Sequence, residues 1–486
     1  MLVKHEFHTT PYRHQEHALD LSLDREFYAF FMEMGTGKSK VLVDTIFNLH
    51  IRGKLDFALI IAPKGVYNNW TQKEIPEHGL PGVRYRVIQW FSGANKKQLA
   101  EMRKVANRFA GLTVFVMNIE ACSLGAGKDT VEWLSRLYGA RGMIAIDEST
   151  GIKNPKAKRT KTLIKAARFF RYRRLLTGSP ATRSPMDLWS QAQFLKPSLL
   201  GSSFISFQAQ YAMLRRRVIP GRAAFNQIVG YQNLDRLAEE IRGWSYRVLK
   251  KECLDLPEKI YTVREVDLTP EQRRHYENLR QLALTELQSG ELVSAPLAVT
   301  RLLRLQQVVC GHLPHEDGEP ERIPSNRVQA VVDIAEETEG KMVVWCRFVE
   351  DIRLIEEALS KAFGDDSVVT YYGATKNRQE VIQEFQDPEH PVRFFVGNQQ
   401  TGGRGITLTE ASVVVYYANT FNLEERLQSE DRAHRIGQKN SVLYVDLVSR
   451  GTVDEKIVSS LQNKIDLSAK VLGEEAQAWL EMKPPR

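Results

Sequence analysis

Short apolar runs recur along the chain, with turn residues at their ends and helix-like segments between them. Continuous apolar runs of this length are typical of parallel strands that are buried on both faces of a sheet. The pattern therefore predicts an α/β fold with two parallel sheets, one in each half of the chain. The predicted strands cover residues 57–62, 112–117, 143–146 and 174–176 in the first half, and residues 342–346, 368–372, 393–396, 413–417 and 442–448 in the second half.

The middle of the chain has a different pattern. Residues 187–327 are more polar and mainly helical in periodicity, and residues 254–259, which include Pro257, are typical of a crossover between two folded parts. We therefore predict two lobes. They cover residues 1–250, with a helical insertion at about residues 187–245, and residues 251–486, with a helical insertion at about residues 268–325 and a C-terminal helical element.

Composition fits a globular protein with two domains, because 486 residues exceed the length at which one hydrophobic core keeps growing. No apolar run approaches the roughly 20 residues of a membrane helix, and the N-terminal residues lack the pattern of a signal peptide. We therefore expect an intracellular protein, cytoplasmic or nuclear, without a membrane partner. The four cysteines lie far apart, without the spacing of a metal site or a disulfide framework, and we expect buried thiols.

A glycine-rich segment lies between an apolar run at residues 28–31 and a helix-like stretch at residues 41–49. Glycines let backbone N–H groups approach phosphate oxygens, and the start of the following helix favours an anion. The segment therefore predicts a phosphate-binding loop for ATP, in which Lys38 contacts the β- and γ-phosphates and Ser39 binds Mg²⁺. Met32 occupies the position of the first glycine of the full motif. The predicted nucleotide contacts are Gly35, Thr36, Gly37, Lys38 and Ser39.

Two carboxylates, Asp147 and Glu148, follow the predicted strand at residues 143–146. Buried charge is costly unless it serves a cation or a reaction, so we assign Asp147 to Mg²⁺ and Glu148 to the attacking water. Taken alone, the pair also fits an acidic turn at a strand end. Phosphoryl transfer further needs positive charge at the transition state. Arg432 and Arg435 are three residues apart, on one face of a predicted helix, where they fit either this role or surface ion pairs.

In this order the motifs resemble those of the Swi/Snf-type ATPases of helicase superfamily two, which translocate on DNA. The resemblance runs from about Pro11 to Lys456 and is most specific at residues 432–438, Arg-Ala-His-Arg-Ile-Gly-Gln. It implies two RecA-like lobes that bind ATP between them, with Gln15 reading adenine and Gly405 lying at the nucleotide. The nucleic-acid contacts that it implies are Pro63, Lys64, Asn69, Trp70, Lys153, Asn154, Ser179, Gly402, Gly403 and Arg404.

Three places depart from the family pattern. Ser149 and Thr150 stand where the family usually has Ala-His, residues 181–183 replace the usual amide-bearing pair, and Arg404 stands at a usually apolar position. The chemistry of hydrolysis does not depend on these positions, whereas the coupling between the ATP state and the grip on DNA does. Arg404 fits either an added phosphate contact or a solvent-facing side chain.

The net charge of +8 is only mildly basic for this length, but the basic residues are unevenly distributed. Residues 153–174 contain ten basic residues and no acidic one, and Arg215, Arg216 and Arg217 form a second cluster. A basic run fits a solvated surface, yet its position beside the motifs favours binding to a phosphate backbone.

We therefore predict a monomeric, DNA-stimulated ATPase that moves along double-stranded DNA and contacts the backbone without reading the base sequence. A strand-separating DNA helicase is an alternative in the same class. A nucleic-acid-binding scaffold whose ATPase has decayed is an alternative of another class. The joint presence of Lys38, Asp147, Glu148, Arg432 and Arg435 disfavours the scaffold.

Overall fold

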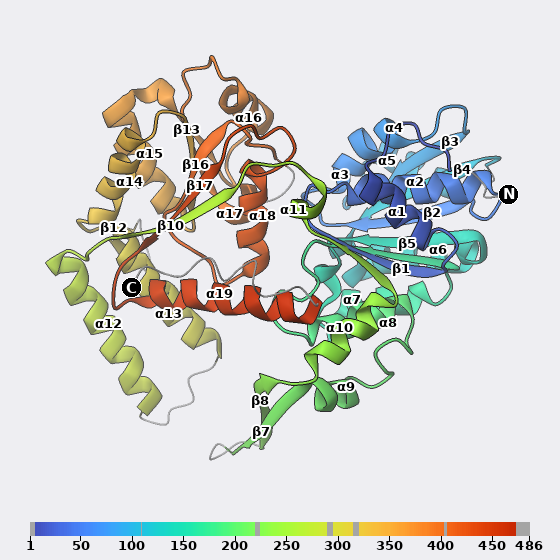
Figure 1. The fold of residues 1–486 in the computed structure, drawn as a ribbon, viewed down its shortest axis with the longest axis horizontal. Coiled ribbons are helices and arrows are strands. Elements are labelled where there is room, and N and C mark those ends of the chain that lie inside the picture. Colours follow the sequence, from blue (N-terminus) through green and yellow to red (C-terminus); the bar gives the residue numbers. More distant parts are fainter. Residues whose placement is uncertain are drawn as a thin grey trace. The chain divides into compact units, whose positions relative to one another are not determined.

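The computed structural model describes residues 5–107, 109–218, 224–288, 295–313, 320–402 and 406–472. Its internal contacts divide the chain into two compact units, Met1–Leu254 with Lys464–Arg486, and Asp255–Asn463. Each unit is built on a parallel sheet with helices on both faces (Figure 1). The predicted α/β class with two parallel sheets is therefore confirmed.

Within the described residues, the sheet of the first unit has seven strands in the order β3-β4-β2-β5-β6-β1-β9. Side chains alternate between its two faces: Phe30 and Met32 join one hydrophobic cluster, and Phe31 joins the other. The strands are β1 (Phe27–Met32), β2 (Phe57–Ala62), β3 (Tyr85–Gln89), β4 (Leu112–Asn118), β5 (Gly142–Asp147), β6 (Tyr172–Leu176) and β9 (Ser245–Val248).

Helices α1 and α2 cover one face of this sheet, and α6, α7, α8 and α10 cover the other. The longer helices are α1 (Arg13–Ser22), α2 (Lys38–Ile51), α5 (Lys96–Arg103), α6 (Gly125–Tyr138), α7 (Lys158–Ala167), α8 (Asp187–Leu195), α9 (Phe204–Tyr211) and α10 (Leu234–Arg242). Short elements are α3 (Tyr67–Asn69), a π-helix (Trp70–Glu74), α4 (Ile75–His78), α11 (Lys250–Cys253) and the hairpin β7 (Ala212–Arg217) and β8 (Phe225–Tyr231).

The sheet of the second unit has six strands within the described residues, in the order β10-β17-β16-β13-β15-β14. They are β10 (Lys259–Glu265), β13 (Lys341–Cys346), β14 (Val368–Tyr371), β15 (Phe394–Asn398), β16 (Ala411–Tyr416) and β17 (Val442–Val448). The helices are α12 (Pro270–Gln288), α13 (Ala295–Cys310), α14 (Asn326–Glu337), α15 (Val349–Phe363), α16 (Arg378–Gln386), α17 (Gln399–Gly402), α18 (Leu423–Ala433) and α19 (Val453–Leu472). A two-stranded ribbon, β11 (His312–Leu313) and β12 (Glu321–Arg322), follows α13.

Every strand predicted from an apolar run is present, to within a few residues at its ends. The prediction that residues 187–327 are mainly helical is wrong at β7, β8, β9 and β10. Among the described strands, β9 and β10 lie at the edges of their sheets, each with one neighbour. An edge strand buries less surface and carries more polar residues, so a search for continuous apolar runs does not detect it.

The end of the chain also differs from the predicted division into lobes. α19 crosses the boundary between the units, because its residues from Lys464 onward belong to the first unit. There Val471 and Leu472 are buried in the same hydrophobic cluster as Leu188 of α8. The helix therefore belongs to both units, rather than to the second lobe alone.

Cys122, Cys310 and Cys346 are buried, as predicted, whereas Cys253 is only partly buried, and all four are free thiols. In the part of the chain that the structure describes, no helix is both long and apolar enough to cross a membrane.

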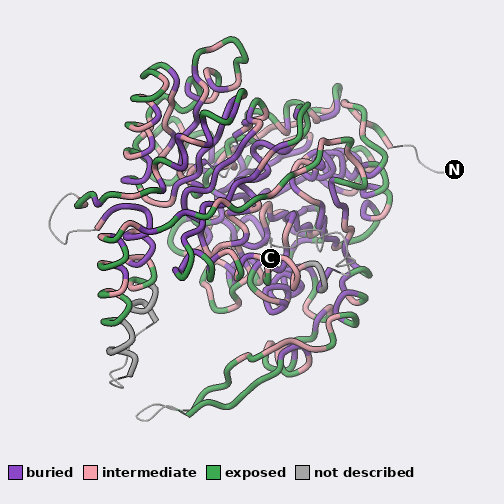
Figure 2. The backbone as a smooth tube through the Cα atoms, turned by 60° about the vertical axis from the view of Figure 1, so that its left-hand side comes forward, coloured by how far each residue is buried: buried purple, intermediate pink, exposed green. Residues whose placement is uncertain are grey.

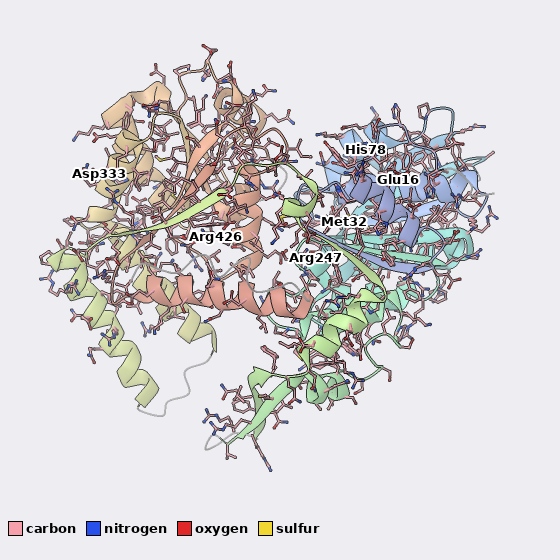
Figure 3. All side chains as sticks on the ribbon, in the orientation of Figure 1. Glu16, Met32, His78, Arg247, Asp333 and Arg426 are labelled. Carbon is pink, nitrogen blue, oxygen red and sulfur yellow. The ribbon has the colours of Figure 1, made fainter. Side chains whose placement is uncertain are left out.

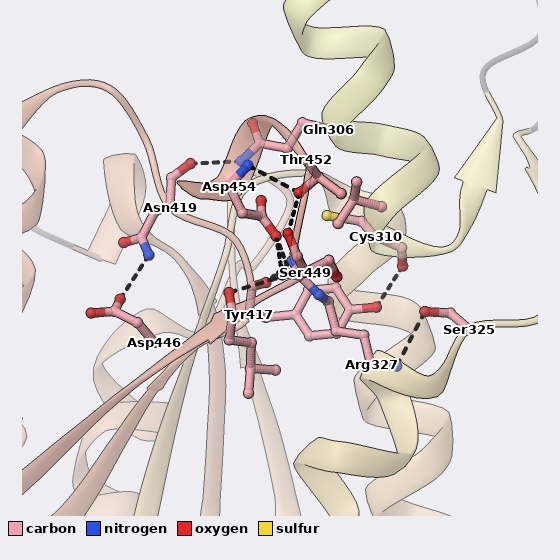
Figure 4. Close-up of polar contacts among 12 residues, drawn as sticks. Gln306, Cys310, Ser325, Arg327, Tyr417, Asn419, Asp446, Ser449, Thr452 and Asp454 are labelled. Atoms are coloured by element: carbon pink, nitrogen blue, oxygen red, sulfur yellow. Dashed lines mark hydrogen bonds and ion pairs between the residues drawn. The ribbon is translucent and has the colours of Figure 1, made fainter. Parts of the chain in front are cut away.

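A buried arginine connects four elements of the second unit (Figure 4). Arg327, at the start of α14, is 1% exposed. Its Nη1 donates to the carbonyl of Tyr417 at 2.7 Å, and its Nη2 donates to the carbonyl of Leu447 at 3.2 Å and to the carboxylate of Asp454. Burial lowers the pKa of Arg327, but the Asp454 carboxylate and the neighbouring groups together raise it above its ordinary value. The network ties α14 to β17, to the end of β16 and to α19.

We expect Arg327→Ala to destabilise the second unit by about 3–5 kcal/mol, because it leaves the Asp454 carboxylate buried without its partner. Arg353→Ala is the matched control, since Arg353 is 46% exposed and pairs with Glu350 at 3.5 Å, and it should cost less than about 1 kcal/mol. Hydrogen exchange in rising urea, followed in peptides from β16 and β17, measures both. Equal protection in the two variants would contradict a structural role for Arg327.

Candidate active site

Loops that carry the predicted motifs leave one edge of the first sheet. β2, β5, β6 and β1 are neighbours and run parallel, so their carboxyl ends meet. Pro63 follows β2, Asp147 ends β5, Thr177 follows β6 and Glu33 follows β1. The carboxyl edge of a parallel sheet is where α/β proteins bind their ligands.

The predicted phosphate loop connects β1 to the start of α2. Gly35 and Gly37 have left-handed backbones, with φ of 76° and 86°. A Cβ atom built on Gly37 would lie 2.1 Å from Nε2 of Gln15, so no other residue fits there without a shift. Thr36, between the glycines, is buried, and its hydroxyl donates to the carbonyl of Glu33 at 2.7 Å. The loop is thus a tight turn that ends at the N-terminus of a 14-residue helix, the setting in which backbone N–H groups bind anions.

Lys38 is the first residue of α2 and is 8% exposed. Its ammonium donates to the carbonyls of Met32 at 2.9 Å and Glu33 at 3.1 Å. Burial lowers the pKa of Lys38, while the carboxylates of Glu148 and Asp147 act in the opposite direction. The lysine and the acidic pair therefore share one electrostatic environment, as a site for a phosphate and a cation requires. Ser39 follows Lys38 at the start of the helix and is partly exposed.

Gln15 packs directly on the phosphate loop. Its Oε1 accepts from the N–H of Tyr12 at 3.0 Å, and its Nε2 donates to the carbonyl of Thr36 at 3.1 Å. The amide therefore connects the start of α1 to the loop, in addition to the predicted contact with adenine. A pocket of about 530 Å³ lies beside the start of α1, next to Gln15 in the sequence. It is lined by Tyr12, Arg13, His14, His17, Tyr246, Glu252 and Cys253.

The two carboxylates after β5 have different environments. Asp147 accepts from the indole Nε1 of Trp70 at 2.9 Å and from the N–H of Glu148 at 3.0 Å. Burial raises the pKa of Asp147, and the Trp70 hydrogen bond and Lys38 oppose this shift. Glu148 has φ of 50°, a conformation that costs energy in a residue other than glycine and that is concentrated at functional sites. Its Oε2 lies 3.5 Å from the Thr177 hydroxyl, which donates to it.

The structure corrects one predicted nucleic-acid contact. Trp70 is 1% exposed and begins the π-helix, an element often found at functional sites. A side chain that is buried and bonded to Asp147 does not reach a ligand at the surface, so the prediction does not hold for this indole. Glu74, at the end of the same turn, lies near Asp147, and burial and this carboxylate raise its pKa. The Trp70 indole therefore holds the Asp147 carboxylate through a hydrogen bond, a contact that no sequence motif indicated.

We expect Trp70→Phe to lower ATP turnover by about tenfold to a hundredfold and to raise the Mg²⁺ concentration needed for half-maximal turnover. The variant loses a hydrogen bond to a charged acceptor, which is worth about 1.5–3 kcal/mol. Trp90→Phe is the matched control, because the buried Trp90 indole has no hydrogen-bond partner within the described residues. Equal effects of the two substitutions in a Mg²⁺ titration of the ATPase would contradict this role.

The other predicted nucleic-acid contacts of the first unit follow β2, β5 and β6 at the same edge of the sheet, and one of them, Asn69, ends α3. Lys64, Asn69 and Asn154 are exposed, Lys153 and Ser179 are partly exposed, and Pro63 is buried. Lys153 donates from Nζ to the Thr182 hydroxyl at 3.0 Å, and Asn69 donates from Nδ2 to Glu74 at 2.9 Å. The buried Pro63 ring can shape its loop but offers no polar atom on its side chain to a phosphate.

The predicted arginine pair lies at the end of α18 in the second unit. The helix ends at Ala433, so Arg435 lies beyond it, and the prediction that one helical face carries both arginines is wrong. They nevertheless converge, because Nη1 of Arg432 and Nη1 of Arg435 donate to the carbonyl of Ile406 at 3.1 Å and 3.3 Å. Gly402 ends α17, where a Cβ atom would lie 2.6 Å from the Trp345 ring. Gly403, Arg404 and Gly405 lie outside the described residues.

Two comparisons with protein-family models identify the chain. The SNF2-related domain matches residues 14–312, and the helicase conserved C-terminal domain matches residues 326–437. The chain belongs to the SNF2-related family. The resemblance inferred from the motifs is therefore confirmed.

Relatives of this SNF2-related chain span a wide range of organisms. It is 25% identical over 447 residues to an uncharacterised ATP-dependent helicase of Mycoplasma genitalium, covering 91% of this chain and 40% of the relative. It is 27% identical over 463 residues to a probable ATP-dependent DNA helicase of Arabidopsis thaliana, covering 90% and 39%. The chain thus spans about two fifths of the length of these relatives. A solved Sulfolobus solfataricus SWI2/SNF2 ATPase core in complex with dsDNA aligns over 99% of this chain and 97% of that chain, at 24% identity and a TM-score of 0.43.

The departures from the SNF2-related pattern contact neighbouring loops. Ser149 is buried and donates from its hydroxyl to Oε1 of Gln191 at 2.6 Å. The Gln191 amide in turn donates to the carbonyl of Pro180 at 2.7 Å. Ser149 therefore links the loop after β5 to the loop after β6 through one side chain of α8. Thr182, another departure, accepts the Lys153 hydrogen bond described above.

Arg247 of β9 is a residue of this site that the sequence reasoning missed. Figure 3 shows it near Met32, the last residue of β1. Its Nη1 donates to the carbonyls of Phe31 at 3.1 Å and Gly178 at 2.9 Å, so it holds the loops after β1 and β6 together. Its charge also contributes to the lowered pKa of Lys38. Arg247 lies on an edge strand that carries no motif, so only a correct prediction of β9 could have indicated this residue.

Proposed function

We propose that this chain hydrolyses ATP and uses the energy to move along double-stranded DNA. The observation that carries the proposal is the meeting of the phosphate loop with Asp147 and Glu148 at one edge of the first sheet. Membership of the SNF2-related family and the names of its relatives support ATP as the substrate.

In the proposed site, the N–H groups of the loop at residues 33–37 and the Lys38 ammonium bind the phosphates of ATP. Lys38 must exchange its carbonyl partners for phosphate oxygens, whose negative charge stabilises a buried ammonium more than neutral carbonyls do. The Ser39 hydroxyl and the Asp147 carboxylate would hold Mg²⁺, and both are oxygen ligands of the kind that this ion takes. When bound, the ion neutralises charge on the phosphates.

Glu148 then orients the attacking water and accepts its proton. The Thr177 hydroxyl, which donates to Glu148, couples this carboxylate to the loop after β6. Arg432 and Arg435 stabilise the negative charge that grows on the transferred group, as an arginine from a second lobe does in related phosphoryl-transfer enzymes.

Cations on the surface of the first unit support DNA as the track. Lys156, Lys158, Lys161 and Lys165, in and just before α7, are exposed. Arg174 is the exception in the basic run, because it is fully buried. Its guanidinium donates to the carbonyls of Ser22, Arg25, Glu26 and Arg173. The run therefore combines a structural arginine with a solvated face that suits phosphates, which are identical at every step along DNA.

The test compares ATP turnover by the full chain with duplex DNA, single-stranded DNA and RNA. We expect the greatest stimulation by duplex DNA, with an affinity that falls steeply with salt, by about 0.9 in log K for each phosphate contact per unit of log salt. Stimulation by RNA alone, or DNA binding that does not change with salt, would contradict duplex DNA as the track. DNA binding without any turnover would indicate the decayed scaffold.

A further inference from the structure

The hairpin of β7 and β8 projects from the body of the first unit (Figures 1 and 2). Within the described residues, the two strands pair only with each other. The end of the hairpin next to the first unit is held in place, because Tyr211 and Ala212 are buried and the Asn233 amide donates to the carbonyl of Gln210 at 2.8 Å. An isolated two-stranded ribbon is marginally stable in water, so a ribbon held out in this way suits a surface that a partner covers.

Both faces of the hairpin are open to solvent. Residues 213–218 and 224–227 are all exposed (Figure 2). They include large apolar side chains, since Val218 is 72% exposed and Phe225 is 45% exposed. Exposed apolar side chains on a ribbon with open edges favour association with another surface.

The charge of the hairpin indicates the chemistry of that partner. Arg215, Arg216 and Arg217 are consecutive in β7, and the sequence from residue 188 to residue 234 contains no aspartate or glutamate. Arg217 donates from Nε to the neutral Gln227 amide at 2.9 Å. No carboxylate of this segment neutralises the three charges, so the partner that fits best is a polyanion.

The register of the strands favours duplex DNA over a single strand as the partner. Arg215 lies opposite Gln227, Arg216 lies opposite Asn226, and Arg217 lies opposite Phe225. Because side chains alternate along a strand, Arg216 is on one face and the other two arginines are on the opposite face. A groove of duplex DNA admits a two-stranded ribbon and has a phosphate backbone on each side. Arginines on both faces of the hairpin can contact the two phosphate backbones of a groove, whereas a single nucleic-acid strand would contact only one face.

We propose that the β7–β8 hairpin is a second DNA-binding element that enters a groove of the duplex. The hairpin is separate from the motif-bearing edge of the sheet. This proposal rests on the proposed function only for the identity of the polyanion. Its arginines bind phosphates on both sides of the groove, and Val218 and Phe225 contact the sugars or base edges between them.

The experiment measures duplex binding by the full chain in rising salt, without nucleotide. In the variant, Arg215, Arg216 and Arg217 are all changed to Gln. We expect a loss of affinity on the order of tenfold to a hundredfold and a salt slope smaller by about 2–3, because each phosphate contact contributes about 0.9. ATP turnover without DNA should stay unchanged. The charge-matched control changes Lys96, Lys97 and Arg103 of α5, which are exposed in the same unit, to Gln.

A second measurement locates the contact directly. A DNA-cleaving reagent attached to Asn226→Cys, in a Cys253→Ser background, should cut both strands of a duplex across one groove. Equal losses in the two triple variants, together with no cutting, would overturn the hairpin site while leaving the proposed function intact. Failure of the unaltered chain to bind duplex DNA would overturn both. Self-association that disappears in the arginine variant, with unchanged DNA binding, would assign the hairpin to a second copy of the chain instead.

Discussion

Glu148→Gln should lower ATP turnover by about 10²–10⁴-fold and leave the affinity for ATP nearly unchanged. A general base contributes a factor of this size, and Glu148 acts on the water rather than on the nucleotide in this account. Glutamine keeps the length of the side chain and can still accept from the Thr177 hydroxyl, so the loop after β6 should keep its place. Steady-state turnover and equilibrium binding of a fluorescent ATP analogue measure the two effects.

Two further variants serve as controls for Glu148. Lys38→Ala should lose both binding and turnover, because the Lys38 ammonium contacts phosphate in the ground state. Glu101→Gln, on the exposed surface of α5, should change neither. Turnover near that of the unaltered chain in Glu148→Gln would show that another group activates the water.

Arg432→Ala should lower turnover by about 10³–10⁵-fold, again with little effect on ATP affinity, because an arginine finger acts on charge that develops in the transition state. The side chain also has a structural part, since its Nε donates to the carbonyl of Gln428 at 2.9 Å. Arg432→Lys is therefore measured beside Arg432→Ala. Lysine keeps the positive charge but lacks the planar guanidinium with its paired N–H donors, so it should restore only part of the rate.

The matched control for Arg432 is Arg450→Ala, which removes an exposed arginine of the second unit that pairs with Glu265. It should keep full turnover. Single-turnover kinetics separate the chemical step from ATP binding in all three variants. If Arg432→Ala hydrolysed bound ATP at the rate of the unaltered chain, the arginine would have no catalytic role.

Continuous apolar runs allowed the buried strands to be predicted. β2 and β17 have the predicted bounds, because central parallel strands are apolar on both faces. The phosphate loop was also predictable, since Gly35 and Gly37 are required by local backbone geometry. These features depend on residues that are close together in the sequence.

The remaining features depend on neighbours in space. The sequence around Trp70 gives no sign that its indole donates to Asp147, because that contact depends on how the π-helix packs. Arg174 lies within a basic run that resembles a surface, yet in β6 it is buried and donates to the carbonyls of Ser22, the last residue of α1, and of Arg25. The hairpin escaped prediction because most residues of its strands are exposed, so a pattern based on core burial does not detect it.

The most direct test of movement on duplex DNA is the displacement of a third strand from a DNA triplex. A motor that tracks along the duplex should release the third strand with ATP, leave the two duplex strands paired, and lose this activity in Glu148→Gln. Release of a duplex strand would indicate the strand-separating helicase instead. ATP hydrolysis stimulated by DNA, but without release of the third strand, would contradict translocation.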